Sequence, residues 1–219
     1  MESKEQAHIV KRGKHKSTHD WNEISKILDD NFIGHFVSMR GDIPVVLPRA
    51  YGRIGKTIYT HGAQKNGLMN ANIKDNYASM TVTSLDGLIL SKSAYHHSIN
   101  YRSAVIFGST RDVENDDEKI QGLKAISDHM LKQRWEDSRF PNENELKATK
   151  VMAIDIEYFV AKINDKTDPG DNKEDLDLAI WAGIIPTSTH YGNPQRAEYC
   201  SPEINLPEYM SELFEMQNT

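Results

Sequence analysis

The stretch that decides the fold is Gly87-Leu-Ile-Leu-Ser-Lys-Ser-Ala-Tyr-His-His-Ser-Ile-Asn-Tyr-Arg-Ser-Ala-Val-Ile-Phe-Gly-Ser-Thr-Arg111. Two apolar runs typical of β-strands, residues 88–90 and 104–107, lie on either side of a polar segment. The hydrogen-bonding side chains of that segment are Ser93, Tyr95, His96, His97, Ser98, Asn100, Tyr101, Arg102 and Ser103. An ordinary core does not hold so many polar groups, so the segment is predicted to contribute to a binding site.

The end of this segment alternates between the two faces of a predicted strand. Asn100 and Arg102 share one face, and the other face carries Tyr101, Ser103, Val105 and Phe107. We expect the face with Phe107 to join a core and the face with Arg102 to meet a ligand outside the sheet. That ligand should be anionic, because a guanidinium presents a fixed fork of donors that suits phosphate.

Residues 93–103 closely resemble a signature of the flavin-nucleotide-binding proteins related to pyridoxamine 5′-phosphate oxidase. Within that group the chain is most similar to the branch of the nitroimidazole-resistance (Nim) proteins. Further matching segments are residues 59–63, 145–149, 161–162 and 181–183. The resemblance extends over roughly residues 11 to 187, and several separate motifs in order are more specific than one short pattern.

The resemblance implies a fold that is mainly β with peripheral helices, namely an antiparallel FMN-binding split β-barrel. It also implies a homodimer with the cofactor at the subunit interface. The strand pattern agrees with a barrel, because seven or more strands follow one another in hairpin order with few helices between them. We divide the chain into a flexible basic arm (1–17), a barrel domain (18–188) and a tail with a short helix (189–219).

Local patterns place the individual elements. Helices are predicted over residues 20–31, 62–73, 115–133 and 142–147, and near 203–216 in the tail. Strands are predicted over residues 34–39, 43–51, 57–61, 77–83, 87–90, 104–113, 151–164 and 180–186. Residues 84–87, Ser-Leu-Asp-Gly, are predicted to be the turn between two of these strands.

Composition limits the possible functions. The chain has 219 residues and a formal net charge of −6, which argues against nucleic-acid binding. A single cysteine, Cys200, excludes an internal disulfide and a Cys-rich zinc site. There is no apolar run of membrane-spanning length and no secretory signal pattern, so we expect a cytoplasmic protein.

A second site element is predicted at residues 59–67, Tyr-Thr-His-Gly-Ala-Gln-Lys-Asn-Gly. A strand that ends before a helix leaves free N–H groups and a positive helix end, which can bind phosphate. The resemblance implies that Lys65, Arg102 and Ser103 contact the FMN phosphate. The residues that it places along the ribityl chain and ring are Tyr59, Thr60, His61 and Ala63.

Other parts of the predicted site are less well determined by the residues themselves. The resemblance implies that the segment Pro48, Arg49, Ala50 and Tyr51 supplies backbone groups to the flavin edge. Its sequence departs from that of the oxidases, which leaves the contact by Arg49 open. Asn100 is a further cofactor-binding candidate. Trp181 is either a core aromatic or an indole near the flavin from the partner subunit.

The histidines allow several readings. His96 and His97 are adjacent and would face opposite ways on a strand, and no helical His-Glu-x-x-His motif is present, so no metal site is predicted. In the Nim-like branch a histidine near the flavin has been considered functional. His61 and His97 are the candidates for a catalytic role, and the sequence does not choose between them.

The favoured function is therefore that of an FMN-dependent oxidoreductase. A nicotinamide donor would reduce the flavin, which would pass electrons to a small planar acceptor such as a nitro-aromatic compound. No counterpart of the oxidase's C-terminal Arg-x-His motif follows Trp181, which argues against pyridoxamine phosphate as the substrate. The alternative is a non-enzymatic flavin- or haem-binding sensor or carrier, so whether the protein is an enzyme stays open.

Overall fold

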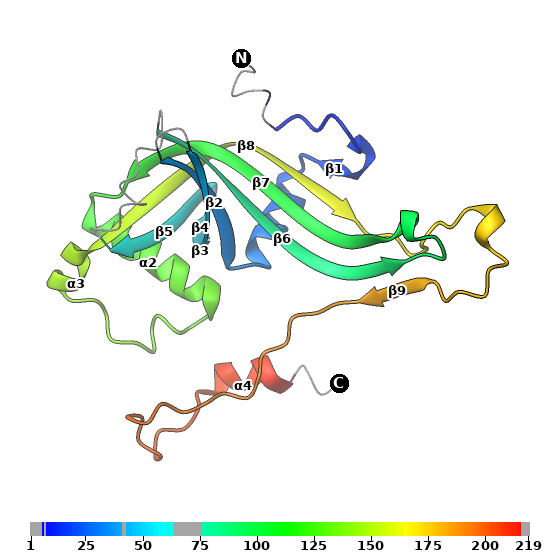
Figure 1. Ribbon diagram of the computed structural model, residues 1–219. Helices are drawn as coiled ribbons and strands as arrows, with labels where there is room; N and C mark the ends of the chain where they lie inside the picture. The colour runs from blue at the N-terminus through cyan, green and yellow to red at the C-terminus, as the bar shows by residue number, and fades with distance from the viewer. Residues whose placement is uncertain (1–5, 7, 41–42, 64–75, 216–219) are drawn as a thin grey trace. The chain divides into compact units, whose positions relative to one another are not determined.

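β-Strands are the main elements of the computed structural model, which describes residues 6, 8–40, 43–63 and 76–215. The chain divides into two compact units, Met1–Pro186 and Thr187–Thr219. The first contains β1 (Ser17–Thr18), α1 (Trp21–Asp29), β2 (Ile33–Arg40), β3 (Ile43–Ala50), β4 (Gly52–Ile54), β5 (Thr57–Ala63), β6 (Tyr77–Leu90), β7 (Ser98–Asp112), α2 (Asp116–Met130), α3 (Glu143–Ala148), β8 (Thr149–Asn164) and β9 (Gly183–Pro186), as Figure 1 shows. The second contains α4 (Glu208–Glu215). The helix predicted over residues 62–73 lies mostly outside the described residues.

The nine described strands form one antiparallel sheet. Its main order is β3-β2-β6-β7-β8-β5-β4, with β1 beside β8 and β9 beside β6. β3 at one end of this order and β5 near the other end come together where the Thr60 hydroxyl of β5 donates to the Ala50 carbonyl of β3 at 3.0 Å. Since β3 leads through Tyr51 directly into β4, the sheet closes on itself there. The prediction of an antiparallel split barrel, mainly β with peripheral helices, is confirmed.

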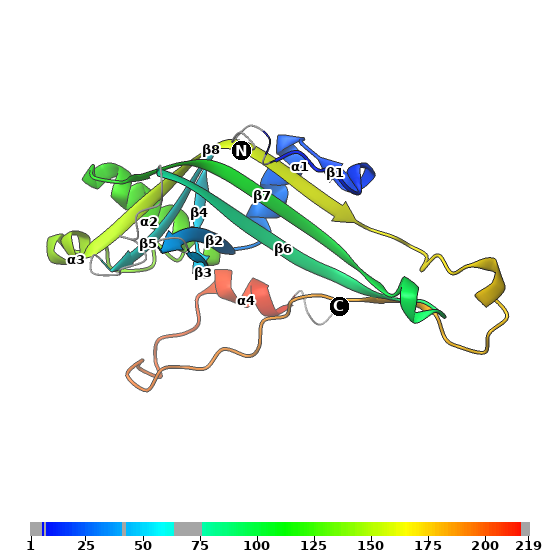
Figure 2. The ribbon, with the colours of Figure 1, turned by 45° about the horizontal axis from the view of Figure 1, so that its top comes forward.

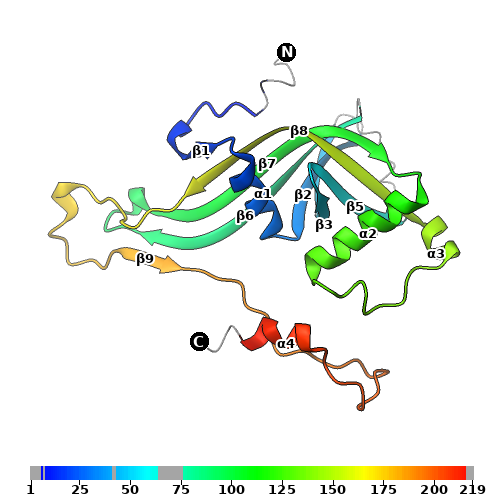
Figure 3. The same ribbon diagram turned by 180° about the vertical axis from the view of Figure 1, so that it is seen from behind.

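Apolar side chains from α1 and from the inner face of the strands fill the barrel. The helix begins after Asp20, whose carboxylate accepts a hydrogen bond from the Asn22 N–H at 2.8 Å and so caps the first turn. Its buried residues are Ile24, Ile27 and Leu28. Tyr51 is fully buried, and its hydroxyl donates to the Leu28 carbonyl at 2.6 Å. In Figure 3, α1 crosses β6 and β7 on this inner side.

The helix α2 packs against β4 and β5 around a second apolar cluster. Its members are Tyr59, Val113, Ile126, Val151 and Ala153. Gly52 allows the close approach, because a Cβ at this position would lie 2.3 Å from the backbone carbon of Ala125. At the end of the helix, the His129 ring nitrogens lie 2.8 Å from the Tyr51 carbonyl oxygen and 3.2 Å from that of Asp29. The helix thus supports the junction between β3 and β4.

The turn predicted at residues 84–87 is wrong. β6 runs without a break from Tyr77 to Leu90, and its pairing with β7 shifts register between Leu85 and Gly87. The chain turns only after Leu90, through a short 3₁₀ segment at Ala94–His96. A β-bulge accommodates the extra residue, Asp86. The local pattern Ser-Leu-Asp-Gly is also typical of a turn, which explains the wrong prediction.

The assignment of the two faces of β7 is also wrong. Ala104 and Ile106 are fully buried in the barrel core, and they lie on the same face as Arg102. Tyr101, Ser103, Val105 and Phe107 lie on the outer face and are half-buried. Figure 2 shows how β6 and β7 run side by side along their whole length. Both faces carry apolar residues, so alternation alone does not show which face is inside.

The N-terminal segment lies along β8 from residue 8 onward. A 3₁₀ turn at Lys14–Lys16 leads into β1, which pairs with Lys162 and Ala161. The ring of His8 stacks on that of Tyr158 with centroids 5.0 Å apart. These contacts place His8 and β1 beside β8 in this unit, and the division into arm, barrel domain and tail stays a prediction. Among the described helices, none is long and apolar enough to cross a membrane.

Candidate functional site

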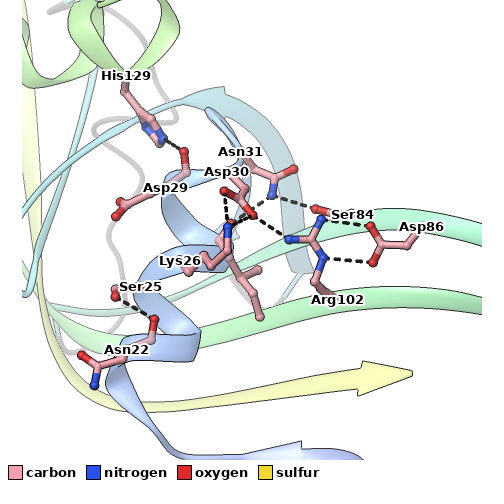
Figure 4. Close-up of polar contacts among 11 residues, drawn as sticks. Asn22, Ser25, Lys26, Asp29, Asp30, Asn31, Ser84, Asp86, Arg102 and His129 are labelled. Carbon is pink, nitrogen blue, oxygen red and sulfur yellow. Dashed lines mark hydrogen bonds and ion pairs between the residues drawn. The ribbon is translucent and has the colours of Figure 1, made fainter. Parts of the chain in front are cut away.

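Arg102 is the centre of a charged cluster between α1, β6 and β7 (Figure 4). Its Nε and Nη2 donate to the two carboxylate oxygens of Asp86 at 3.0 and 2.9 Å. Its Nη1 donates to Asp30 at 2.6 Å. All three side-chain nitrogens of Arg102 thus face carboxylates. These bonds, those to Asp86 first, raise the pKa of Arg102 above its ordinary value.

The same cluster holds the end of α1 in place. Partial burial by itself would raise the pKa of Asp30, but hydrogen bonds from Arg102 and Lys26 outweigh it, so the pKa lies below 3.8. The Asn31 side-chain amide donates to the Ile27 carbonyl at 3.0 Å and to the Ser84 hydroxyl at 2.9 Å. The cluster therefore anchors the helix end to β6 and β7, as Figure 4 shows.

Two other candidates near Arg102 also have partners within the chain. The buried Asn100 amide donates to the Lys166 carbonyl at 2.8 Å, and its oxygen accepts the Lys166 N–H at 3.0 Å. Ser103 lies on the opposite face, where its hydroxyl donates to the Val82 carbonyl at 3.0 Å. Asn100 and Ser103 thus do not converge with Arg102 on one point. Their predicted cofactor contacts remain untested.

A second group of candidates lies at the β3–β5 junction, which we define as residues 48–51 and 59–63. Thr60 is buried and is bound to Ala50, whereas Pro48 and Ala63 are exposed. Tyr51 belongs to the core. Arg49 is half-buried, and burial lowers the pKa of its guanidinium.

His61 is the titratable group at this junction. Its side chain keeps access to solvent, yet enough of the protein surrounds it to lower its pKa below 6.5. The positive charge of Arg49 lowers that pKa further. An imidazole in this setting is neutral at pH 7 and can offer a ring nitrogen as a hydrogen-bond acceptor or a ligand.

Tyr59 has its partners on α2, and its predicted contact with a cofactor stays untested. Its ring packs under α2 at Gly122, and its hydroxyl donates to Glu118 at 3.0 Å. Glu118 also accepts two hydrogen bonds from Arg111, at 2.7 and 3.0 Å. Burial and then the Glu118 carboxylate raise the pKa of Tyr59. Tyr59 therefore ties β5 to the start of α2.

His97 and Trp181 lie at the far end of the sheet. The His97 Nε2 is 3.1 Å from the Ser91 carbonyl oxygen, just before β7 begins. The Trp181 side chain is 64% exposed and packs on Gly183 at the start of β9. His61, in contrast, pairs with Val151 near the beginning of β8. The two catalytic candidates are thus far apart in one chain.

Arg102 is also far from the end of β5. Ala63 pairs with Thr149, and Arg102 pairs with Ile163, 14 positions further along β8. At about 3.3 Å per residue this corresponds to roughly 45 Å along a straight strand. Lys65 lies outside the described residues, two positions beyond the end of β5. One copy of the chain therefore does not bring Arg102 to the end of β5.

Sequence reasoning missed the partners of Arg102. The sequence pattern predicts Asp86 in a turn and Asp30 near the end of a helix, and neither prediction links these carboxylates to β7. Ser84 pairs with Arg102 across β6 and β7, so a strand that continues through Asp86 brings this carboxylate close to the guanidinium. Among the described residues no group of three or more His, Cys, Asp or Glu side chains could hold a metal ion.

Comparisons with known proteins agree with this fold. A solved structure with 28% identity and a TM-score of 0.85 is the flavocytochrome Anf3 from Azotobacter vinelandii, over 93% of this chain and 94% of that chain. An FAD- and haem-binding protein from Mycobacterium smegmatis has the same identity and TM-score over 91% and 97%. A protein assigned to 5-nitroimidazole antibiotic resistance from Bacteroides thetaiotaomicron shares the fold, at 20% identity and a TM-score of 0.57 over 67% and 86%. No curated protein matches the chain.

The family comparison covers most of the barrel. The model described as pyridoxamine 5′-phosphate oxidase matches residues 20–163, more than half of the chain. This range includes α1, the β3–β5 junction and the whole of β6 and β7. The chain therefore belongs to the pyridoxamine 5′-phosphate oxidase family.

Proposed function

We propose that this chain binds a flavin nucleotide and acts as an oxidoreductase. The observation that supports this most strongly is the likeness, over more than 90% of both chains, to a flavocytochrome and to an FAD- and haem-binding protein. A bound flavin would supply the electron-transfer chemistry. The chain would bind it, orient it and limit its contact with water.

The β3–β5 junction is the better place for an anionic group of the cofactor. Arg49 offers a positive charge there, and His61 is kept neutral beside it. Lys65 follows two positions after β5 in the sequence and would add a second cation. Arg102 fits a phosphate less well, because its nitrogens already donate to Asp86 and Asp30. We assign phosphate binding to Arg49 and Lys65 because both belong to the segments around His61, and we assign an anchoring role to Arg102.

The remaining cofactor contacts require two copies of the chain. Ser103 and Trp181 are far along the sheet from His61, so they can reach the same cofactor only from a partner subunit. We therefore propose a homodimer with two equivalent sites, in keeping with the common two-fold symmetry of oligomers. Within each site the carbonyls of Ala50 and Tyr51 already accept bonds from Thr60 and His129, which holds the junction rigid.

The flavin is proposed to be FMN, and FAD is the alternative raised by the mycobacterial protein. Purified protein should show flavin absorption bands. Heat-released cofactor, separated by chromatography against FMN and FAD standards, identifies the nucleotide. Purified protein that neither carries flavin nor takes it up when FMN or FAD is added would contradict flavin binding.

The electron donor and acceptor are proposed from the redox chemistry of flavins. A nicotinamide should reduce the bound flavin, and a small planar acceptor such as a nitro-aromatic compound should reoxidise it. Anaerobic addition of NADH or NADPH should bleach the flavin bands, and a nitroimidazole should restore them. Flavin that stays oxidised with both donors would favour a non-enzymatic carrier or sensor.

Haem binding is a second candidate function, because two structures similar over more than 90% of this chain are of a flavocytochrome and of an FAD- and haem-binding protein. An axial ligand must be an unprotonated imidazole, and the lowered pKa of His61 meets this requirement. Arg49 beside it could pair with a propionate carboxylate. Protein supplied with haem should then show a Soret band that is lost in His61→Ala and kept in His97→Ala. A Soret band that is kept in His61→Ala and lost in His97→Ala would indicate that the axial ligand lies at the other end of the sheet.

A further inference from the structure

The side chain of His129 connects the ends of two helices to the β3–β5 junction (Figure 4). It lies in the last turn of α2. Its Nδ1 is 2.8 Å from the carbonyl oxygen of Tyr51, which directly follows β3, and its Nε2 is 3.2 Å from the carbonyl oxygen of Asp29 at the end of α1. The Tyr51 ring packs edge-on against the imidazole, with the ring centroids 4.9 Å apart. One side chain thus contacts the backbone of two other elements.

Both partners of this ring are acceptors. A carbonyl oxygen carries no proton, so each of the two bonds needs an N–H on the imidazole. A neutral imidazole has one N–H, and only the imidazolium has two. The two bonds of His129 therefore exist together only when both ring nitrogens carry a proton. In the neutral form one bond is lost, and the lone pair of a ring nitrogen then faces the lone pairs of a carbonyl oxygen.

The position of the ring at two helix ends favours its positive charge. The last carbonyls of a helix have no partners within the helix and give its C-terminus a partial negative charge. His129 belongs to the last turn of α2, and Asp29 is the last residue of α1. A cation at this point therefore interacts favourably with both helix ends.

The other charged groups near the ring already have partners of opposite charge. On α1, β4 and α2 these ion pairs are Asp29 with Arg53, Asp30 with Arg102 and Lys26, and Asp128 with Lys124. Lys132, which follows α2, is exposed. Burial raises the pKa of Tyr51, whose hydroxyl keeps its proton and donates to the Leu28 carbonyl. Carboxylates, lysines and arginines keep their charge between about pH 6 and pH 9, so the imidazole is the group of this set that titrates near neutral pH.

A short path of bonds leads from His129 to the proposed flavin site. Tyr51 follows Ala50, whose carbonyl accepts the Thr60 hydroxyl at 3.0 Å, and Thr60 precedes His61. The ring of His129 thus holds the backbone between the two segments that carry Arg49 and His61.

We infer that His129 is a positioning residue of the β3–β5 junction that acts in its doubly protonated form, so that loss of one ring proton loosens the junction and weakens flavin binding. The inference rests on the proposed function, because it concerns the same site. Its sign follows from the two carbonyl partners: the second bond is present when the ring is charged and is lost as the pH rises through the titration of the imidazole. Flavin affinity should therefore contain a contribution from His129 that disappears at high pH.

The test is the Kd of FMN for the full-length wild type and His129→Gln, measured by flavin fluorescence between about pH 6 and pH 9. The amide of Gln can donate to one carbonyl at every pH, as the neutral imidazole does. Dividing the Kd of the variant by that of the wild type cancels the titration of His61 and of the FMN phosphate, which both proteins share. The ratio should be about fivefold at pH 6, as expected for a charged hydrogen bond whose loss is only partly transmitted to the site, and should fall toward about 1 at pH 9.

His190→Gln is the matched control. The partner of the His190 ring is the Ser188 hydroxyl at 2.8 Å, which can donate or accept, so this bond does not need a second ring proton. The same ratio for this variant should stay near about 1 at every pH.

A second measurement needs neither a variant nor a flavin. The nitrogen-15 chemical shifts of the His129 ring in labelled wild-type protein distinguish protonated from unprotonated nitrogens, and both nitrogens should be protonated at pH 6. A ratio that does not change with pH in folded His129→Gln, or a ring with one unprotonated nitrogen at pH 6, would overturn the inference. Protein that binds no FMN or FAD would contradict the proposed function instead, and the ring shifts would then decide whether His129 braces the junction as a cation.

Discussion

Arg102 illustrates how one residue can match a family signature and still have its donors occupied. Its guanidinium is bound by two carboxylates from different elements, and its side chain is 32% exposed. Arg102→Ala leaves Asp86 and Asp30 without their main partner. We expect the free energy of unfolding to fall by about 1–2 kcal/mol, the range for a charged hydrogen bond discounted for partial exposure. Urea unfolding measures this loss, and the slope of unfolding free energy against urea concentration should stay unchanged.

Lys26→Ala is the control for that experiment. Lys26 also bonds to Asp30, but its side chain is 72% exposed, so its removal should cost no more than about 0.5 kcal/mol. Equal losses in the two variants would show that the Arg102 cluster does not anchor α1.

The same cluster predicts how stability depends on pH. The pKa of Asp30 is lower in the folded protein than its ordinary value of 3.8. Its ion pairs therefore stabilise the fold fully above pH 3.8, and this contribution is lost as the pH falls through the folded-state pKa. The difference in unfolding free energy between wild type and Arg102→Ala should accordingly shrink as the pH is lowered from about 6 to about 3. A difference that stays constant over this range would contradict the role of Asp30.

His61 gives the most direct probe of the β3–β5 junction. Burial first and Arg49 second lower its pKa below 6.5. In the Arg49→Ala variant the charge is removed, so the pKa of His61 should rise toward 6.5. NMR titration of the imidazole protons measures this, and Arg49→Lys should keep the lowered value. An unchanged pKa in Arg49→Ala would mean that the two side chains are not neighbours.

At the scale of elements, local signals predicted most helices and strands well. Asp20 and Asn115 cap α1 and α2, and the Asn142–Glu145 capping box starts α3. The failures have non-local causes. β6 continues through Asp86 because β7 and β9 pair along both of its edges, and no local propensity encodes such pairings.

The contact between α2 and β4 depends on one glycine. In Gly52→Ala the new Cβ would lie 2.3 Å from the Ala125 backbone, which cannot move without shifting the helix. We expect a loss of about 2–3 kcal/mol in the free energy of unfolding, typical of overpacking against rigid neighbours. Gly192→Ala is the control, because nothing lies within 4 Å of its added Cβ. Thermal or urea unfolding compares the two, and equal stability would contradict the close packing.

At the scale of the whole molecule, sequence motifs identified the family and the barrel but not the grouping of the site. Residues that adjoin in the signature, such as Arg102 and Ser103, point to opposite faces of the sheet. Arg102 and the end of β5 at Ala63 pair with positions near opposite ends of β8. These separations arise from strand length and register, so short sequence motifs do not predict them. The charge of Arg49 acts on His61, twelve positions away in the sequence, because β3 and β5 meet at this junction.

The location of the flavin site is tested most directly by flavin affinity. Apoprotein of the wild type, Arg49→Ala and Arg102→Ala is titrated with the identified nucleotide, and the quenching of flavin fluorescence gives Kd. Arg49→Ala should raise Kd at least about tenfold, as expected when a charged hydrogen bond is lost. Arg102→Ala, measured where it is fully folded, should change Kd by less than about threefold. An unchanged Kd in Arg49→Ala together with a tenfold rise in Arg102→Ala would contradict a site at the β3–β5 junction.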